Sequence, residues 1–302
     1  MDRILVFVAT LLPAVTVLLY GVIKTRGEWN GALLKSLLIG GVAAAVCLPV
    51  EMALSYLLTP APALLAALST AVLIVAIPEE SAKFSALIGV AGRDADRRRK
   101  QDVLLMAVGV SVGFAMLESI FFVVSNSDWQ MEAPPGRAVT AVPVHGINGL
   151  LMGALLTGAR LQKSRRLLVL ALAVPILVHA AYDFPLFVLK TDFKLWASVL
   201  WFAVVLLSTV LAIYLCNRFL QAASRADAAS ARDTRKAMRS RHYMRNYLIG
   251  GTALIVASIA VATILMLTQY NDFAWMGAVV AMLPVALGLD LIWEGLRPYR
   301  LP

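Results

Sequence analysis

Long apolar runs recur along almost the whole chain, and they constrain its fold more than any other feature. Each run is about 20 residues long, which is the length an α-helix needs to cross a hydrocarbon core. We therefore predict an all-α fold, a polytopic membrane helix bundle with about nine transmembrane spans. The expected spans cover residues 4–23, 32–58, 63–91, 102–125, 138–160, 167–189, 194–217, 247–269 and 273–293.

Composition supports a membrane protein and argues against a nucleic-acid-binding one. Of the 302 residues, 60% are hydrophobic and 15% charged, whereas soluble domains are about half apolar and a quarter charged. The net charge of +9 comes from basic residues in short gaps between runs, without the basic stripe and interleaved aromatics of a nucleic-acid surface. Cys47 and Cys216 lie in apolar runs, and their spacing fits no metal motif.

Charge in the gaps between runs predicts the topology. Basic gaps face the cytoplasm, and here basic and non-basic gaps alternate. The basic gaps are 24–35, 92–101, 160–166, 218–246 and the C-terminal tail, and the others are 59–62, 126–137, 190–193 and 270–272. We expect the N-terminus outside, an uncleaved first span and a cytoplasmic C-terminus.

The long basic stretch also divides the chain into parts. We expect a membrane-embedded domain over 1–217 with its core at about 60–190, a basic cytoplasmic helical linker over 218–246, and two further spans within 247–302. The linker is expected to lie on anionic lipid headgroups.

Residues 78–83, with the sequence PEESAK, interrupt an apolar stretch. A charge at the bilayer centre costs about 2.5–3.5 kcal/mol on insertion scales, so such charges usually serve a function. Pro78 should kink or break the helix, and Lys83 can pair with Glu79 one turn earlier. Glu80 should point about 100° away and need another partner. Two adjacent buried carboxylates do not both ionise easily, so one of them should take up a proton more readily, as a general base must. The structural alternative is that these residues form a charge pair that holds helices together.

Further polar residues lie inside the next three spans. Glu118 has no basic residue within a helical turn, so its partner must come from another span. His145 lies in the following span, with Arg137 near the outer edge. His179 and Asp183, at i and i+4, share one helix face, where a carboxylate can orient an imidazole.

These residues fall at one common depth, about 17–25 Å from the cytoplasmic ends of their spans. Unrelated helix contacts would not be expected at a single level. We therefore predict one polar cavity that admits water or a substrate. Its expected members are Glu79, Glu80, Glu118, His145, His179 and Asp183.

At this point the motifs resemble those of the PrsW-type membrane peptidases. EESAK at 79–83 is similar to that family's EExxK motif, FAMLE at 114–118 to FxxxE, and HAAYD at 179–183 to HxxxD, with His145 similar to the intervening histidine. The resemblance covers about residues 60–190. The wider superfamily contains type II CAAX prenyl endopeptidases, bacteriocin-processing-type membrane peptidases and the scaffold subunit of gamma-secretase.

The resemblance implies a peptidase in a bacterial inner (cytoplasmic) membrane that cleaves a membrane-anchored protein, such as an anti-sigma factor. Our hypothesis is hydrolysis by an activated water. Glu79 or Glu80 acts as the general base, Glu118 and His145 position the water, and His179 stabilises the oxyanion or protonates the leaving amine.

The other motif residues are expected to support this chemistry. Lys83 neutralises Glu79 and tunes it, while Phe114 and Arg137 have structural roles. The prenyl endopeptidases usually carry Asn at the last motif position, where this chain has Asp183. Because an ionised Asp cannot donate a hydrogen bond to an oxyanion, we assign it the orientation of His179.

We favour a metal-free reaction without a cofactor, and a zinc-dependent one is the alternative. Zinc would be held by His145, His179 and Glu80 with one open position, but the chain has no H-E-x-x-H motif.

Two other classes of protein remain open. Buried Glu, His and Asp residues also serve as proton relays in proton-coupled transporters. A catalytically inactive scaffold is the third interpretation, since the superfamily contains one.

Overall fold

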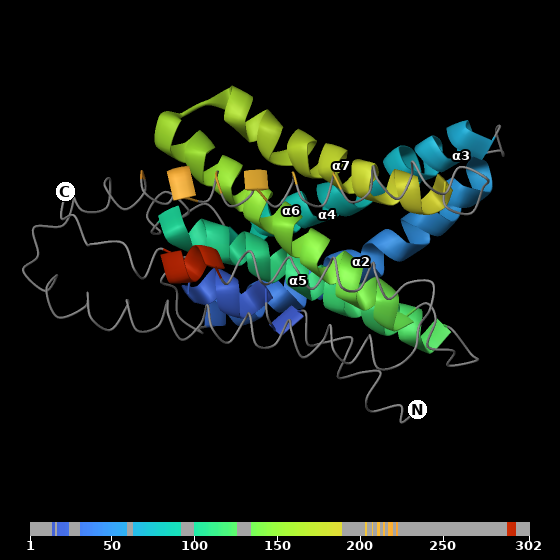
Figure 1. The fold of residues 1–302 in the computed structure, drawn as a ribbon, viewed down its shortest axis with the longest axis horizontal. Coiled ribbons are helices and arrows are strands. Elements are labelled where there is room, and N and C mark those ends of the chain that lie inside the picture. The colour runs from blue at the N-terminus through green and yellow to red at the C-terminus, as the bar shows by residue number, and fades with distance from the viewer. Residues whose placement is uncertain are drawn as a thin grey trace, which may run out of the picture.

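The computed structural model of the chain is helical at every residue it describes except Leu58, Lys163 and Ser164 (Figure 1). The described residues are 14–15, 17–23, 31–58, 63–91, 100–125, 134–188, 289–293 and scattered positions between 203 and 222. Most of expected spans one, seven, eight and nine, and the linker 218–246, therefore lie outside the described residues.

The ordered helices agree with expected spans two to six to within a few residues. They are α2 (Gly31–Leu57), α3 (Ala63–Ser69), η1 (Thr70–Ala76), α4 (Ile77–Ala91), α5 (Lys100–Ser125), α6 (Pro134–Gln162) and α7 (Arg165–Val188). The prediction of an all-helical chain is confirmed for this part of the protein.

Four helices of the described residues are long and apolar enough to cross a membrane: Gly31–Leu57, Leu64–Ala91, Asp102–Phe122 and Arg165–Val188. They correspond to expected spans two, three, four and six. The helix α6, expected as span five, is 29 residues long but is not one of these four. A membrane helix bundle is therefore supported.

Of the predicted kink or break at Pro78, the break is wrong, because one helix runs continuously from Leu64 to Ala91. A π-helical segment, η1, directly precedes α4. In a π-helix the hydrogen bonds span five residues instead of four. This local change of pairing precedes a proline that cannot donate a backbone hydrogen bond, and the helix continues into the residues that carry both glutamates.

Glycines let the helices around α5 approach closely, as small residues commonly do between membrane helices. A Cβ atom at Gly113 would overlap the backbone carbonyl of Leu37 in α2. At Gly149 in α6, a Cβ atom would lie 2.8 Å from the side chain of Ser111 in α5. The backbones of α2, α5 and α6 thus pack with little side-chain material between them.

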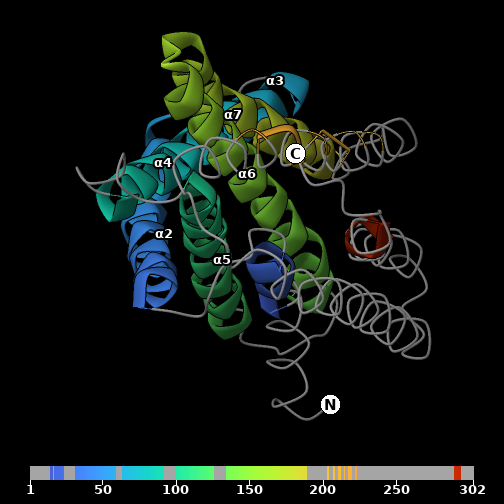
Figure 2. The same cartoon turned by 90° about the vertical axis from the view of Figure 1, so that its left-hand side faces the viewer.

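The polar residues lie against these closely packed helices. Figure 2 shows α2, α5 and α6 side by side, and α5 contacts both of the others. The helix α7 contacts α6 and also η1 and α4, while α4 contacts α2 and α5. The four helices α4, α5, α6 and α7 therefore meet in one region.

Candidate functional site

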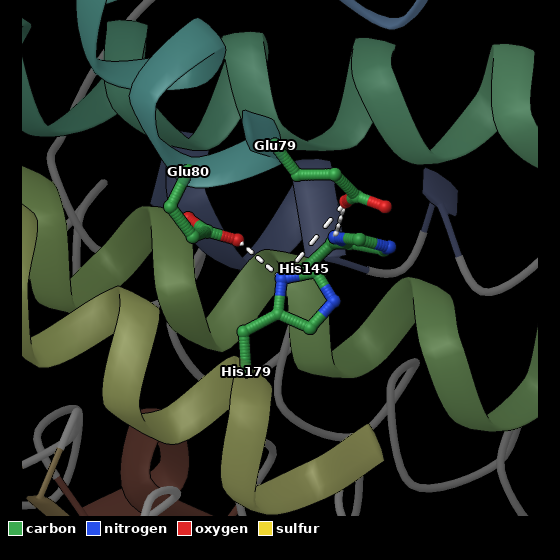
Figure 3. Close-up of side chains that lie close together, drawn as sticks. All are labelled: Glu79, Glu80, His145 and His179. Atoms are coloured by element: carbon green, nitrogen blue, oxygen red, sulfur yellow. Dashed lines mark hydrogen bonds and ion pairs between the residues drawn. The ribbon is translucent and has the colours of Figure 1, made fainter. Parts of the chain in front are cut away.

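All six residues predicted to share a site lie in one buried cluster in that region. Glu79 and Glu80 come from α4, and their side chains point towards the imidazoles of His145 from α6 and His179 from α7 (Figure 3). Glu118 from α5 and Asp183 from α7 complete the set. None of the six is more than 9% exposed.

Lys83 lies at the centre of the cluster. Its Nζ is 3.0 Å from Glu79 Oε2 and 2.8 Å from Glu80 Oε1. The pairing with Glu79 confirms the i,i+4 prediction. Glu80 also pairs with Lys83, which the sequence prediction did not foresee, because residues three apart on a helix are neighbours too. The prediction that Glu80 needs another partner is confirmed, since it contacts His179 and Asn148.

The ammonium of Lys83 also reaches across to α6. Its Nζ lies 2.8 Å from Nδ1 of His145 and 4.2 Å from the centroid of the Phe114 ring. A cation over an aromatic face is attracted by the electrons of the ring. Phe114, the first residue of the FxxxE motif, therefore helps to hold Lys83 in place.

Glu80 receives three donors on a single oxygen atom. Besides Lys83, its Oε1 lies 2.8 Å from Nδ1 of His179 and accepts a hydrogen bond of 3.3 Å from Nδ2 of Asn148. Its other oxygen, Oε2, is buried and has no hydrogen-bond partner among the described residues. Glu80 is thus firmly oriented on one side and available as an acceptor on the other.

The two histidines have the same arrangement. Each turns Nδ1 towards α4, His145 to Lys83 and His179 to Glu80, both at 2.8 Å, and places Nε2 against a separate carboxylate. His145 Nε2 is 2.9 Å from Oε2 of Glu118, and His179 Nε2 is 3.3 Å from Oδ2 of Asp183. The expectation that Glu118 finds its partner on another span is confirmed, and Asp183 has the position needed to orient His179.

The same cluster contains a set of atoms that could hold a metal ion. One ligand atom each from Glu79, Glu80, His145 and His179 lies within 4.8 Å of the others. Imidazole nitrogens and carboxylate oxygens are ligands that zinc accepts. Histidine ligands of metals usually donate their second N–H to a carboxylate, as these two are placed to do. The residues therefore fit a metal, and the set adds Glu79 to the three ligands expected from the sequence.

Two residues of this region were missed by the sequence prediction. Asn148 is fully buried, and its amide inside an apolar run, three residues after His145, is the signal that could have found it. Glu51 in α2 is half-buried and lies one helical turn after Cys47, which packs against Phe114. Glu51 lies within an apolar run, so the cost of burying a charge would have singled it out. Arg137 lies in α6, and its side chain is outside the described residues.

A helical membrane bundle that encloses paired carboxylates and histidines has the composition of a membrane-embedded hydrolase site. The chain matches the model of a family described as PrsW family intramembrane metalloprotease over residues 28–213. Since this match covers more than half of the chain, the protein belongs to the PrsW family. The resemblance noted in the sequence motifs is thereby confirmed.

Curated relatives agree with this assignment. Protease PrsW of Halalkalibacterium halodurans is 34% identical over 107 residues, which is 35% of this chain and 48% of the relative. Protease PrsW of Clostridioides difficile is 28% identical over 127 residues (40% and 52% of the two chains), and that of Bacillus subtilis is 33% identical over 109 residues (35% and 49%). The chain thus spans about half the length of the curated relatives it matches. No solved structure matches the chain.

Proposed function

We propose that the protein is an intramembrane peptidase that hydrolyses a peptide bond in or near the membrane span of another protein. The observation that carries this proposal is the arrangement of the two histidines. His179 presents Nδ1 to Glu80, His145 presents Nδ1 to Lys83 with Glu79 Oε2 at 3.9 Å, and each ring has a carboxylate behind it. Such an arrangement of acids, bases and orienting groups is what general acid–base hydrolysis needs.

Glu80 is the general base in this proposal. Three donors hold Oε1, so the carboxylate has a defined orientation, and the buried Oε2 has no partner among the described residues. A water molecule would satisfy such an acceptor and could give it a proton during attack on the substrate carbonyl. Glu79 stays paired with Lys83 and neutralises its charge.

The histidines act on the other atoms of the reaction. His179 lies between Glu80 and Asp183, so it can take the water proton from Glu80 and then pass a proton to the leaving amine. The Asp183 carboxylate stabilises the imidazolium that exists between these two transfers. His145 is held by Glu118. We therefore assign Glu118 the orientation of His145, in addition to the water-positioning role expected from the sequence.

A metal-dependent version of the reaction is supported by the family description and by the four-ligand set. Glu79, Glu80, His145 and His179 would hold the ion, with Glu118 and Asp183 fixing the two imidazoles. A bound zinc ion would supply Lewis-acid activation of water and of the carbonyl. Charge balance favours a bound metal ion. Among the described residues the cluster contains four buried carboxylates and one lysine, and an excess of buried negative charge is costly.

We propose a nine-span topology with the N-terminus outside. In it, the first, fifth, seventh and ninth spans all end at the cytoplasmic face. Contacts between segments near those ends support it: Tyr20 and Asn217 donate to Asp290 at 3.1 and 3.2 Å, and a Cβ atom at Gly158 would overlap the ring of Phe219. Segments that meet in this way end on the same side of the membrane.

The remaining parts of the proposal follow from family membership. The match over residues 28–213 supports a peptidase domain within 1–217 with its core at 60–190, followed by the linker 218–246 and a last part over 247–302. The substrate would be a membrane-anchored protein, for example an anti-sigma factor, in a bacterial inner membrane.

The test is a comparison of membrane-protein N-termini in the native cell by mass spectrometry. Wild type is compared with Glu80→Gln and with Glu79→Gln at equal abundance. We expect an N-terminus in or beside a membrane span of another protein that is present in wild type and absent in Glu80→Gln. Glu79→Gln should retain partial cleavage if Glu80 is the base.

The control separates a loss of chemistry from a loss of folding. Gln retains the size of Glu, so both variants should keep the wild-type elution volume and unfolding midpoint in detergent. If no terminus differs under several envelope stresses although the variants fold, the peptidase proposal is overturned. A proton flux that Glu80→Gln abolishes would then favour the transporter, and a lost partner complex the scaffold.

A further inference from the structure

Lys83 and a metal ion would both need the same atom, Nδ1 of His145. An imidazole that donates from Nε2 has a single lone pair, on Nδ1. His145 Nε2 lies 2.9 Å from the Glu118 carboxylate, which accepts a hydrogen bond when it is ionised, so we assign the N–H to that side. The lone pair of Nδ1 is directed at Nζ of Lys83, 2.8 Å away. While this contact is made, His145 has no electron pair left for a metal.

The same lysine holds two more atoms of the four-ligand set. Glu79 Oε2 and Glu80 Oε1 lie 3.0 and 2.8 Å from Nζ. The carboxylates have second oxygens, so they could bind a metal and Lys83 together. His145 has no such choice, because its other nitrogen is engaged with Glu118. The histidine is therefore the residue that a metal and the lysine cannot share.

We propose that Lys83 and a divalent metal ion are alternative occupants of this site, and that the lysine must leave His145 before His145 can become a ligand. The ammonium is already bound by the atoms that would bind a cation, and it lies over the Phe114 ring at 4.2 Å. Lys83 thus acts as a cation built into the chain. It holds the ligands together in the metal-free protein and lowers the affinity of the site for metal.

This inference does not depend on proteolysis, because it concerns metal binding alone. It also separates two classes of residue within the EESAK motif. Glu79 and Glu80 would favour metal binding, whereas Lys83 would oppose it. If the lysine were only the structural partner of Glu79, its removal would unbalance the carboxylates without any specific effect on His145.

The experiment measures zinc affinity of the full-length protein in detergent by competition with a chelator, and zinc content by mass spectrometry. Four proteins form a cycle: wild type, Lys83→Met, His145→Ala and the double variant. Lys83→Met should bind zinc about tenfold more tightly or better, since zinc no longer breaks a charged hydrogen bond to reach His145. His145→Ala should weaken binding more in the Lys83→Met background than in wild type.

Lys35→Met is the matched control, because Lys35 lies exposed on α2 and should leave zinc affinity unchanged. Weaker or equal zinc binding by Lys83→Met, or strictly additive effects in the cycle, would overturn the proposal. Should Lys83→Met fail to fold, Lys83→Gln keeps a donor without the charge.

The wild-type protein gives an independent test. Its site should bind zinc more weakly than typical four-ligand zinc sites do, so it should release zinc to a chelator of about nanomolar affinity. Retention of one zinc per chain in the presence of that chelator would contradict the inference.

Discussion

The imidazole rings of His145 and His179 meet edge to face, with centroids 5.2 Å apart and planes at 89°. In this orientation Nδ1 of His145 faces Lys83 and Nδ1 of His179 faces Glu80, both on α4, and the two Nε2 atoms reach different helices. His145 reaches Glu118 on α5, and His179 reaches Asp183 on its own helix. Each ring is thus oriented by a carboxylate on the side away from α4, Glu118 for His145 and Asp183 for His179.

The carboxylates behind the histidines can be tested by charge-neutral replacement. Asp183→Asn and Glu118→Gln keep the size of the side chain and can still accept a hydrogen bond, but they no longer stabilise a positively charged ring. Loss of such an orienting group typically costs about 10–100-fold in activity. We expect each variant to lower the rate of substrate cleavage in reconstituted membranes by this factor, with an unchanged unfolding midpoint.

Glu118→Ala and Asp183→Ala extend this comparison, because they also leave the imidazole without an acceptor. They should be less active than the amide variants. Equal activity of wild type, amide and alanine variants would show that neither carboxylate takes part in orienting a histidine.

Asn148 should matter for stability because it helps to satisfy Glu80. Its Nδ2 donates to Glu80 Oε1 at 3.3 Å, and the side chain is fully buried. Asn148→Ala should lower the free energy of unfolding by about 1–3 kcal/mol, the usual effect of removing one partner from a buried hydrogen bond. Asn148→Asp should be more destabilising, since it adds a carboxylate beside Glu80.

Ser111→Ala provides the matched control for Asn148. Ser111 is also fully buried in the bundle, but its Oγ has no hydrogen-bond partner within the part of the chain that the structure describes. Its replacement should change the free energy of unfolding less than Asn148→Ala does. The reverse order, measured by denaturant unfolding in detergent micelles, would argue against a supporting role for Asn148.

Phe114 should stabilise the position of Lys83. Phe114→Leu removes the aromatic face at 4.2 Å from Nζ and should destabilise the protein by about 0.5–2 kcal/mol for the cation–π contact, beyond any loss of packing. Phe121→Leu on the same helix is the control, because Phe121 is 46% exposed. If both variants unfold at the same denaturant concentration, the ring does not hold the lysine.

Sequence reasoning located the site because charge inside a membrane span is costly wherever it occurs. The spacing of residues along one helix predicted the contact of Lys83 with Glu79 and of His179 with Asp183, since i,i+4 neighbours depend only on helix geometry. The resemblance of the motifs then gave the family. Those parts of the prediction needed no knowledge of packing.

Contacts between helices could not be derived in the same way. Lys83 meets His145, and Glu80 meets His179, only because α4, α6 and α7 are rotated so that these faces meet. Rotation depends on how side chains interlock, and no single pattern in the chain specifies it. The π-helical segment before Pro78 has no residue signature either, so a broken helix was the natural but wrong expectation.

Close packing of α2 against α5 gives the last prediction. A Cβ atom at Gly113 would overlap the carbonyl of Leu37, and one at Gly40 would overlap the carbonyl of Val110. Backbone atoms cannot move aside like the end of a flexible side chain, so Gly113→Ala must push the two helices apart. We expect it to lower the free energy of unfolding by about 1–3 kcal/mol, the usual cost of overpacking, and to reduce cleavage because α5 carries Glu118.

Gly89→Ala is the control: nothing lies within 4 Å of a Cβ atom there, and alanine in a helix is favoured over glycine by up to about 1 kcal/mol. Thermal unfolding of the two variants in the same detergent should therefore shift in opposite directions, and a destabilised Gly89→Ala with an unchanged Gly113→Ala would contradict the close approach of α2 and α5.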